Sequence, residues 1–273
     1  MVSHGWWYCP LSVSLSLCLV GGSPQVAQAR ENLEQPRAFP VVSTDQAQGI
    51  SNNRTADQQF QRGIRVYQFG TIASLRSVLD IFDQALKLYQ ATGSQQDVAK
   101  VLLWKGYIYS LLNQPQEALQ FYNQALSIYQ DIRDSSGEGN SFNNIGVVYD
   151  DVGQFQQALQ HYNQALPQYR RVQDWQGEAN TLNNIGILYK NAGRYQDALR
   201  FYQQALRIYQ QQQEASGKAN TLEMIGSIYE SLGETQQSLR YFNQALPIYQ
   251  EIGDSNGQMR MLQNGGSFCN GIQ

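Results

Sequence analysis

Charged residues are scarce in this sequence, and runs of basic residues are missing altogether. Only 15% of its 273 residues are Asp, Glu, Lys or Arg, and the 19 basic residues do not outnumber the 22 acidic ones. Nucleic acids and acidic membrane surfaces attract proteins that carry a positive field, so neither is expected as a partner. The polar residues are mostly uncharged Gln and Asn, and the chain is long enough for one or two domains with a buried core.

Cysteine and histidine are also rare, with three Cys and two His residues. A chain cleaved after Ala29 would lose Cys9 and Cys18, and the remaining Cys269 could form no internal disulfide. Its one histidine would be His161, and nothing in the spacing brings this imidazole to the Cys269 thiol, as a Cys-His dyad requires. The acidic residues are too isolated for metal ligation. We therefore expect no catalytic residue, no metal site and no cofactor.

The first 29 residues differ from the rest because they contain no Lys, Arg, Asp or Glu. An apolar stretch over Leu11–Val20 is too short to span a bilayer and is followed by the small-x-small sequence Ala27-Gln28-Ala29. This order predicts a signal peptide over residues 1–29 and export to the periplasm or the extracellular space. The alternative is a leader without signal function, which would leave the protein in the cytoplasm. Residues 30–56 lack a helical period and are predicted to be a flexible linker.

The remaining chain repeats itself every forty residues. An Ala-Leu pair recurs at Ala85-Leu86, Ala125-Leu126, Ala165-Leu166, Ala205-Leu206 and Ala245-Leu246. A glycine recurs at Gly106, Gly146, Gly186 and Gly226. In each unit the apolar residues follow two helical periods, and Gly153 is expected to end the first helix of the second unit. We predict four helical hairpins over residues 97–256, preceded by a divergent hairpin over 57–96 and followed by an incomplete unit and tail over 257–273.

Two residue types inside the expected helices call for an explanation. A glycine within a helix costs about 1 kcal/mol relative to alanine. Its recurrence predicts that another backbone crosses there, with a small partner on the following helix at Ala118, Ala158, Ala198 or Ser238. Pro167 and Pro247 fall inside expected second helices, where a proline removes a hydrogen bond. A kink or a restarted helix is predicted at both prolines.

The order of small and aromatic residues resembles that of the tetratricopeptide repeat. It is illustrated by Gly146, Tyr149, Ala158, Tyr162 and Ala165. The forty-residue period is similar to that of kinesin light chain and of the repeat arrays attached to bacterial CHAT protease domains. The resemblance implies an all-α fold, a right-handed superhelical solenoid of antiparallel helix hairpins. A coiled coil is disfavoured because forty is not a multiple of seven and the glycines would interrupt its seam.

A second stripe on the first helices is rich in asparagine. The resemblance implies that first helices line a concave groove, where amide groups can both donate to and accept from the backbone of an extended peptide. The alternative is that asparagine is simply tolerated on a solvated helix face. The predicted groove residues are Asn140, Asn143, Asn144, Asn180, Asn183, Asn184, Asn220, Lys100 and Trp104.

These features predict a non-catalytic protein–protein interaction module or scaffold that binds a protein or peptide partner. Two alternatives remain open. In the first, the chain would be a truncated fragment of a larger repeat protein and would lack a C-terminal catalytic domain of the CHAT protease kind. In the second, it would be a structural solenoid that associates with itself through its incomplete ends. The second alternative follows from the incomplete last unit, because a solenoid that ends halfway through a unit leaves a packing face uncovered.

Overall fold

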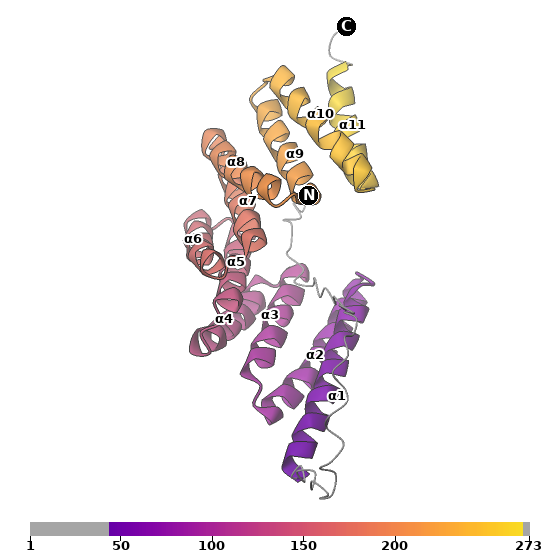
Figure 1. The fold of residues 1–273 in the computed structure, drawn as a ribbon, viewed down its shortest axis with the longest axis vertical. Helices are drawn as coiled ribbons and strands as arrows, with labels where there is room; N and C mark the ends of the chain where they lie inside the picture. The colour runs from indigo at the N-terminus through magenta and orange to yellow at the C-terminus, as the bar shows by residue number, and fades with distance from the viewer. Residues whose placement is uncertain (1–43, 270–273) are drawn as a thin grey trace, which may run out of the picture.

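The computed structural model describes residues 44–269, and all elements of this part are α-helices. The helices are α1 (Thr44–Tyr67), α2 (Ile72–Thr92), α3 (Gln95–Leu111), α4 (Pro115–Asp131), α5 (Ser135–Asp151), α6 (Phe155–Arg171), α7 (Trp175–Asn191), α8 (Tyr195–Gln211), α9 (Ala215–Ser231), α10 (Thr235–Glu251) and α11 (Ser255–Cys269). They stack hairpin upon hairpin into an elongated, curved array (Figure 1). The predicted all-α solenoid of helix hairpins is confirmed. None of the described helices is long and apolar enough to cross a membrane.

The N-terminal hairpin is longer than predicted. Helix α1 begins at Thr44, so residues 44–56 of the predicted linker are helical, and Ala56 is fully buried. The stretch over 44–56 carries few apolar residues, so its sequence shows no helical period. The predicted signal peptide over 1–29 and residues 30–43 of the predicted linker lie outside the described residues.

The turns between helices repeat every twenty residues. From Gly93 onward each turn contains one residue in the left-handed conformation, at Gly93, Asn113, Arg133, Gly153, Gln173, Gly193, Gln213, Gly233 and Gly253. At Gly153 the φ angle is 73°, and the N–H of the next residue donates to the carbonyl of Tyr149 at 2.7 Å. This is the hydrogen-bond pattern that closes a helix C-terminus. The predicted end of the first helix at Gly153 is confirmed.

Each recurring glycine accommodates an aromatic ring. A Cβ added at Gly186 would lie 2.3 Å from a ring carbon of Tyr202, which comes from the paired second helix and is fully buried. The same arrangement joins Gly106 to Tyr122, Gly146 to Tyr162 and Gly226 to Phe242. This corrects the prediction of a crossing backbone with a small partner. Ala118, Ala158, Ala198 and Ser238 are fully buried in the core, but the glycines face rings instead.

The two internal prolines do not interrupt their helices. Helix α6 is continuous through Pro167, and α10 is continuous through Pro247. Both prolines are exposed, so a carbonyl that loses its helical N–H partner has access to water. The predicted restart of the helix is therefore wrong at both positions.

Candidate peptide-binding face

The first helices α3, α5, α7 and α9 lie on the inner side of the curve. Successive first helices contact each other, α3 with α5 and α5 with α7, more than successive second helices do. In the described part of the chain, side-chain hydrogen bonds between residues 37 to 41 positions apart also join first helices and no second helices. Because a curved stack is shorter on its inside, the closer approach of the first helices places the predicted asparagine stripe on the concave side.

The central asparagines form a ladder, and its bonds run between repeats. The amide nitrogen of Asn184 donates to Oδ1 of Asn143 at 3.1 Å, and the hydroxyl of Thr181 donates to the same oxygen at 3.1 Å. In the next step the amide nitrogen of Asn183 donates to the hydroxyl of Thr221 at 3.0 Å. Asn143, Asn183 and Asn184 are buried. These side chains therefore join α5 to α7 and α7 to α9.

The asparagines near the helix N-termini have a different task. Each accepts a hydrogen bond from the hydroxyl of a tyrosine at the end of the paired second helix. The pairs are Tyr169 with Asn140 at 2.8 Å, Tyr209 with Asn180 at 2.5 Å and Tyr249 with Asn220 at 2.6 Å. A sequence pattern can place these asparagines on a face, but it cannot show that the acceptor is already used within the hairpin.

The first unit closes the face with an aromatic cluster. Trp104 is buried and packs edge to face against the rings of Phe60, Phe82 and Tyr67. The ammonium group of Lys100 lies 5.0 Å from the centre of the Phe60 ring. The structure thus places both predicted residues against the divergent hairpin, where Phe60 of α1 and Phe82 of α2 cover this end of the stack.

Asn144 differs from the other predicted asparagines because it has no polar partner among the described residues. It is half-buried on α5. Within the described residues, Nδ2 of Asn143 donates no hydrogen bond and Oδ1 of Asn184 accepts none, and neither atom is among the buried polar atoms without a partner. These three amide groups therefore keep hydrogen-bonding capacity that the described part of the solenoid does not use.

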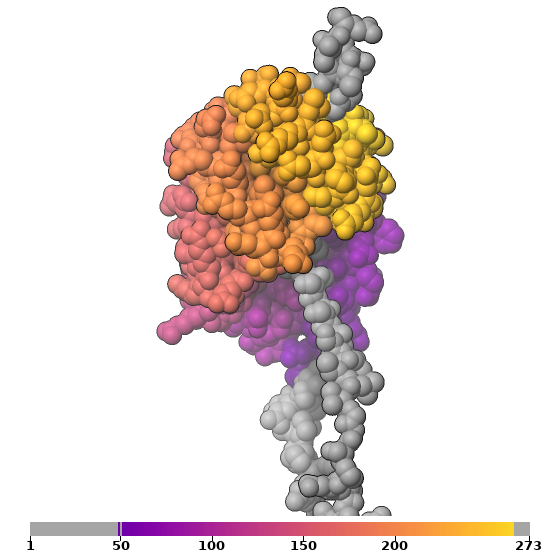
Figure 2. All heavy atoms as spheres, turned by 45° about the horizontal axis from the view of Figure 1, so that its top comes forward, coloured from indigo at the N-terminus to yellow at the C-terminus, as the bar shows by residue number. Residues whose placement is uncertain are grey.

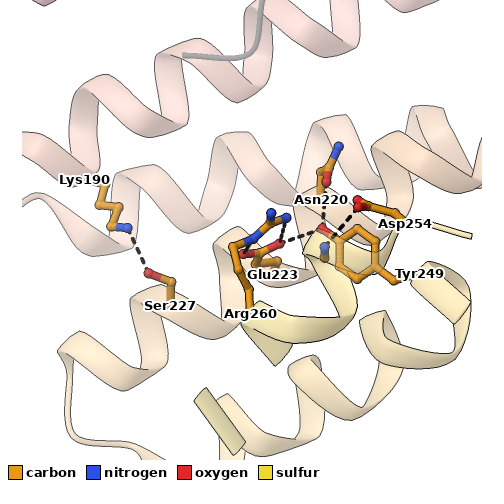
Figure 3. A network of polar contacts seen from close by, with 8 residues as sticks. Lys190, Asn220, Glu223, Ser227, Tyr249, Asp254 and Arg260 are labelled. Atoms are coloured by element: carbon orange, nitrogen blue, oxygen red, sulfur yellow. Dashed lines mark hydrogen bonds and ion pairs between the residues drawn. The ribbon is translucent and has the colours of Figure 1, made fainter. Parts of the chain in front are cut away.

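A charged network closes the other end of the face (Figure 3). Arg260 of α11 donates two hydrogen bonds, of 2.7 and 2.9 Å, to the carboxylate of Glu223 on α9. The hydroxyl oxygen of Tyr249 also lies 2.6 Å from this carboxylate, so its single hydrogen is shared between Glu223 and Asn220, and burial together with the bond to Glu223 raises the pKa of Tyr249. On α7, Lys190 donates to Ser227 of α9 at 2.8 Å, and burial lowers its pKa. The charges at this end therefore have partners within the solenoid.

Asp150 and Asp151, at the end of α5, form no ion pair in the described part of the chain. Burial and the neighbouring Asp151 raise the pKa of Asp150 to about 6, although a hydrogen bond with Asn191 opposes the shift. The negative end of the helix dipole also disfavours a carboxylate at this position. The sequence analysis assigned these residues no role in binding. An acidic pair in the last turn of a helix is nevertheless visible in the sequence and is unfavourable at that position.

Replacing Asp150 by asparagine is expected to stabilise the protein at pH 7.5. The folded-state pKa of Asp150 is raised above its unfolded value, so ionisation costs stability above pH 6 and costs nothing below about pH 4. Allowing for solvent screening, the gain is about 1 kcal/mol at pH 7.5 and disappears at pH 4. Urea unfolding at the two pH values measures it. Asp131→Asn, at an exposed carboxylate, is the control, and an equal gain from both variants would contradict the prediction.

His161 packs among aromatic rings of its own unit. His161 stacks on Tyr149 at 5.3 Å and on Phe142 at 6.1 Å, and burial lowers its pKa. Cys269 is among the residues whose side chains the structure does not describe. Within residues whose side chains are described, no group of three or more His, Cys, Asp or Glu residues is placed to hold a metal ion.

Comparison with known families agrees with this architecture. A family model described as tetratricopeptide repeat matches residues 97–171, 137–211 and 177–251, which together exceed half of the chain. The chain therefore belongs to the tetratricopeptide repeat family, as predicted. A search among curated proteins found no match.

Solved structures share the fold at low sequence identity. Aspartyl phosphate phosphatase F from Bacillus subtilis aligns at 17% identity and a TM-score of 0.70, over 78% of this chain and 55% of that one. A putative kinesin light chain from Podosopora anserina with nearly identical repeats aligns at 16% and 0.59, over 75% and 98%. A Rap protein complexed with competence and sporulation factor aligns at 17% and 0.65, over 74% and 56%. The chain thus spans about half the length of the first and third of these proteins.

Proposed function

We propose that the chain is a non-catalytic protein-interaction module that holds an extended peptide along its inner face. The observation that carries the proposal is the half-buried amide group of Asn144 on α5, which has no hydrogen-bond partner among the described residues, together with the amides of Asn143 and Asn184, which bond to each other and each keep further hydrogen-bonding capacity. An extended peptide presents one N–H and one C=O per residue. A row of side-chain amides pairs with both, whatever side chains the peptide carries.

The ladder bonds make this face rigid before a peptide arrives. Because Oδ1 of Asn143 already accepts from Asn184 and Thr181, the orientation of its amide group is set and its donors point away from these partners. Less side-chain entropy is then lost on binding, which favours affinity. Asp150 and Asp151 lie on the same helix without a basic partner, so a peptide with Lys or Arg at the matching position is favoured.

The test selects peptides from a displayed random library on the full chain and measures their affinities by calorimetry. Asn144→Ala is expected to weaken binding about 3- to 10-fold, since it removes neutral hydrogen bonds. Asn163→Ala is the matched control, because Asn163 is exposed on α6, outside the inner face. Equal affinities for the two variants, or no selected peptide at all, would contradict the proposal.

A further inference from the structure

Asn143 and Asn183 hold the same position in successive units, but their amide groups face opposite ways. Asn143 turns Oδ1 toward α7, where the amide nitrogen of Asn184 donates to it at 3.1 Å. Asn183 instead turns its amide nitrogen toward α9 and donates to the hydroxyl of Thr221 at 3.0 Å. The α5–α7 step and the α7–α9 step of the inner face therefore differ in the groups that they leave for a ligand.

The threonines beside these amides are equivalent and do not explain the difference. Thr181 and Thr221 are both fully buried, and their hydroxyls lie 2.8 and 2.7 Å from the carbonyl four residues earlier. They also lie 3.1 and 3.4 Å from the asparagine oxygen of the preceding unit. A hydroxyl has one hydrogen to donate and also accepts, so each threonine is able to bond either end of the amide. The threonines therefore do not decide which way the amides face.

The two steps do differ in the residue that stands 41 positions after each asparagine. For Asn143 this residue is Asn184, which has an amide donor, and for Asn183 it is Met224, which has none. In the first step the donor on α7 holds the Asn143 oxygen. In the second step no amide donor stands at this position, and the Asn183 nitrogen bonds to the threonine instead.

We propose that Asn184 is a positioning residue, which turns the donors of Asn143 outward and so assigns backbone binding to the α5–α7 step. Nδ2 of Asn143 has no acceptor among the described residues and is not a buried atom without a partner, so it is left for a ligand. The donor of Asn183 is already bonded within the solenoid. A peptide carbonyl therefore pairs at the first step and not at the second. The orientation stands by itself, whereas its use in binding rests on the proposed function.

The same rule accounts for Asn144. The residue 41 positions before it, Leu103 on α3, has no polar side-chain group, and Asn144 has no polar partner in the described part of the chain. The units concerned follow one another along the array, as the colours from magenta to orange show in Figure 2. The ladder of amide bonds thus ends on one side at Leu103 and on the other at Met224.

Exchange of the asparagine side-chain amides with water, followed by nuclear magnetic resonance on the isotope-labelled full chain, tests the orientation. The Asn183 amide is expected to exchange about tenfold more slowly than that of Asn143, because it is hydrogen-bonded. Asn184→Met is expected to slow Asn143, whose nitrogen then turns to the threonine. Met224→Asn is expected to speed Asn183. Met224 is half-buried, so this second variant keeps the fold, which far-UV circular dichroism checks.

Ser231→Asn is the matched control, because it adds an amide to α9 at an exposed position beyond Met224. It is expected to leave the exchange of Asn183 unchanged. Equal exchange of Asn143 and Asn183 in the unaltered chain overturns the inference. So does fast exchange of Asn143 that persists in Asn184→Met, or slow exchange of Asn183 that persists in Met224→Asn.

Peptide affinity separates this inference from the proposed function. Asn184→Met is expected to weaken the selected peptides about 3- to 10-fold, because the donors of Asn143 are no longer offered to them. Switched exchange with unchanged affinity would support Asn184 as the positioning residue and contradict peptide binding at this step. Weaker binding without any switch in exchange would overturn the positioning role and leave the proposed function standing.

Discussion

Replacing Tyr202 by alanine is expected to lower the free energy of unfolding by about 3–5 kcal/mol. The Tyr202 ring is fully buried and fills the space above Gly186, between α7 and α8. Removal of the ring leaves a cavity at the centre of one hairpin, and the neighbouring units then lose a rigid packing surface. Urea unfolding followed by far-UV circular dichroism measures the loss.

Tyr202→Phe is the matched variant and is expected to be neutral or slightly stabilising. The Tyr202 hydroxyl is buried without a hydrogen-bond partner, and burial raises its pKa. A buried unpaired hydroxyl costs free energy, so its removal costs nothing in packing and relieves desolvation. The next unit already has a phenylalanine, Phe242, in the same register. A loss above about 1 kcal/mol for Tyr202→Phe would mean that the hydroxyl has a stabilising partner.

Replacing Gly186 by alanine is expected to destabilise the protein by about 1–3 kcal/mol. Helix propensity alone favours alanine by about 1 kcal/mol, but the new Cβ would lie 2.3 Å from the Tyr202 ring. The ring is enclosed and has no room to withdraw, so the steric term exceeds the propensity term. The change in the urea midpoint reports the net sign.

The variant Gly49→Ala separates the helix-propensity effect from the steric effect. Gly49 also lies inside a helix, α1, but an added Cβ there meets nothing within 4 Å. This variant is therefore expected to stabilise the protein by about 0.5–1 kcal/mol. If both glycine variants stabilise the protein, the ring at Tyr202 moves more freely than the packing indicates, and the account of the recurring glycines is wrong.

The repeat itself was predictable because short, local spacings of residues in the sequence define it. Five Ala-Leu pairs at a forty-residue interval and a glycine at each first helix define hairpins without any knowledge of long-range contacts. Helix ends were equally local, since Gly153 closes α5 through bonds within one turn. The start of α1 was not predictable, because residues 44–56 show almost no apolar period although they are helical.

The partner of each glycine shows where local spacing stops being sufficient. An alanine and an aromatic residue of the next helix are both separated from Gly146 by a number of residues that permits a close approach. Only the relative rotation of the two helices selects the Tyr162 ring over Ala158. That rotation depends on how all the side chains of the hairpin interdigitate, which no single spacing encodes.

The properties of the asparagine face also fall into those that the sequence determines and those that only the tertiary structure determines. The sequence by itself determined that Asn140, Asn143 and Asn144 share one side of a helix, because 3.6 residues per turn leaves no other choice. Only the tertiary structure decided that Asn140 accepts from a tyrosine, that Asn143 pairs across repeats and that Asn144 has no polar partner among the described residues. The reason is physical: an amide is satisfied by whichever donor or acceptor the neighbouring unit brings within about 3 Å, and that is set by the rise and curvature of the stack.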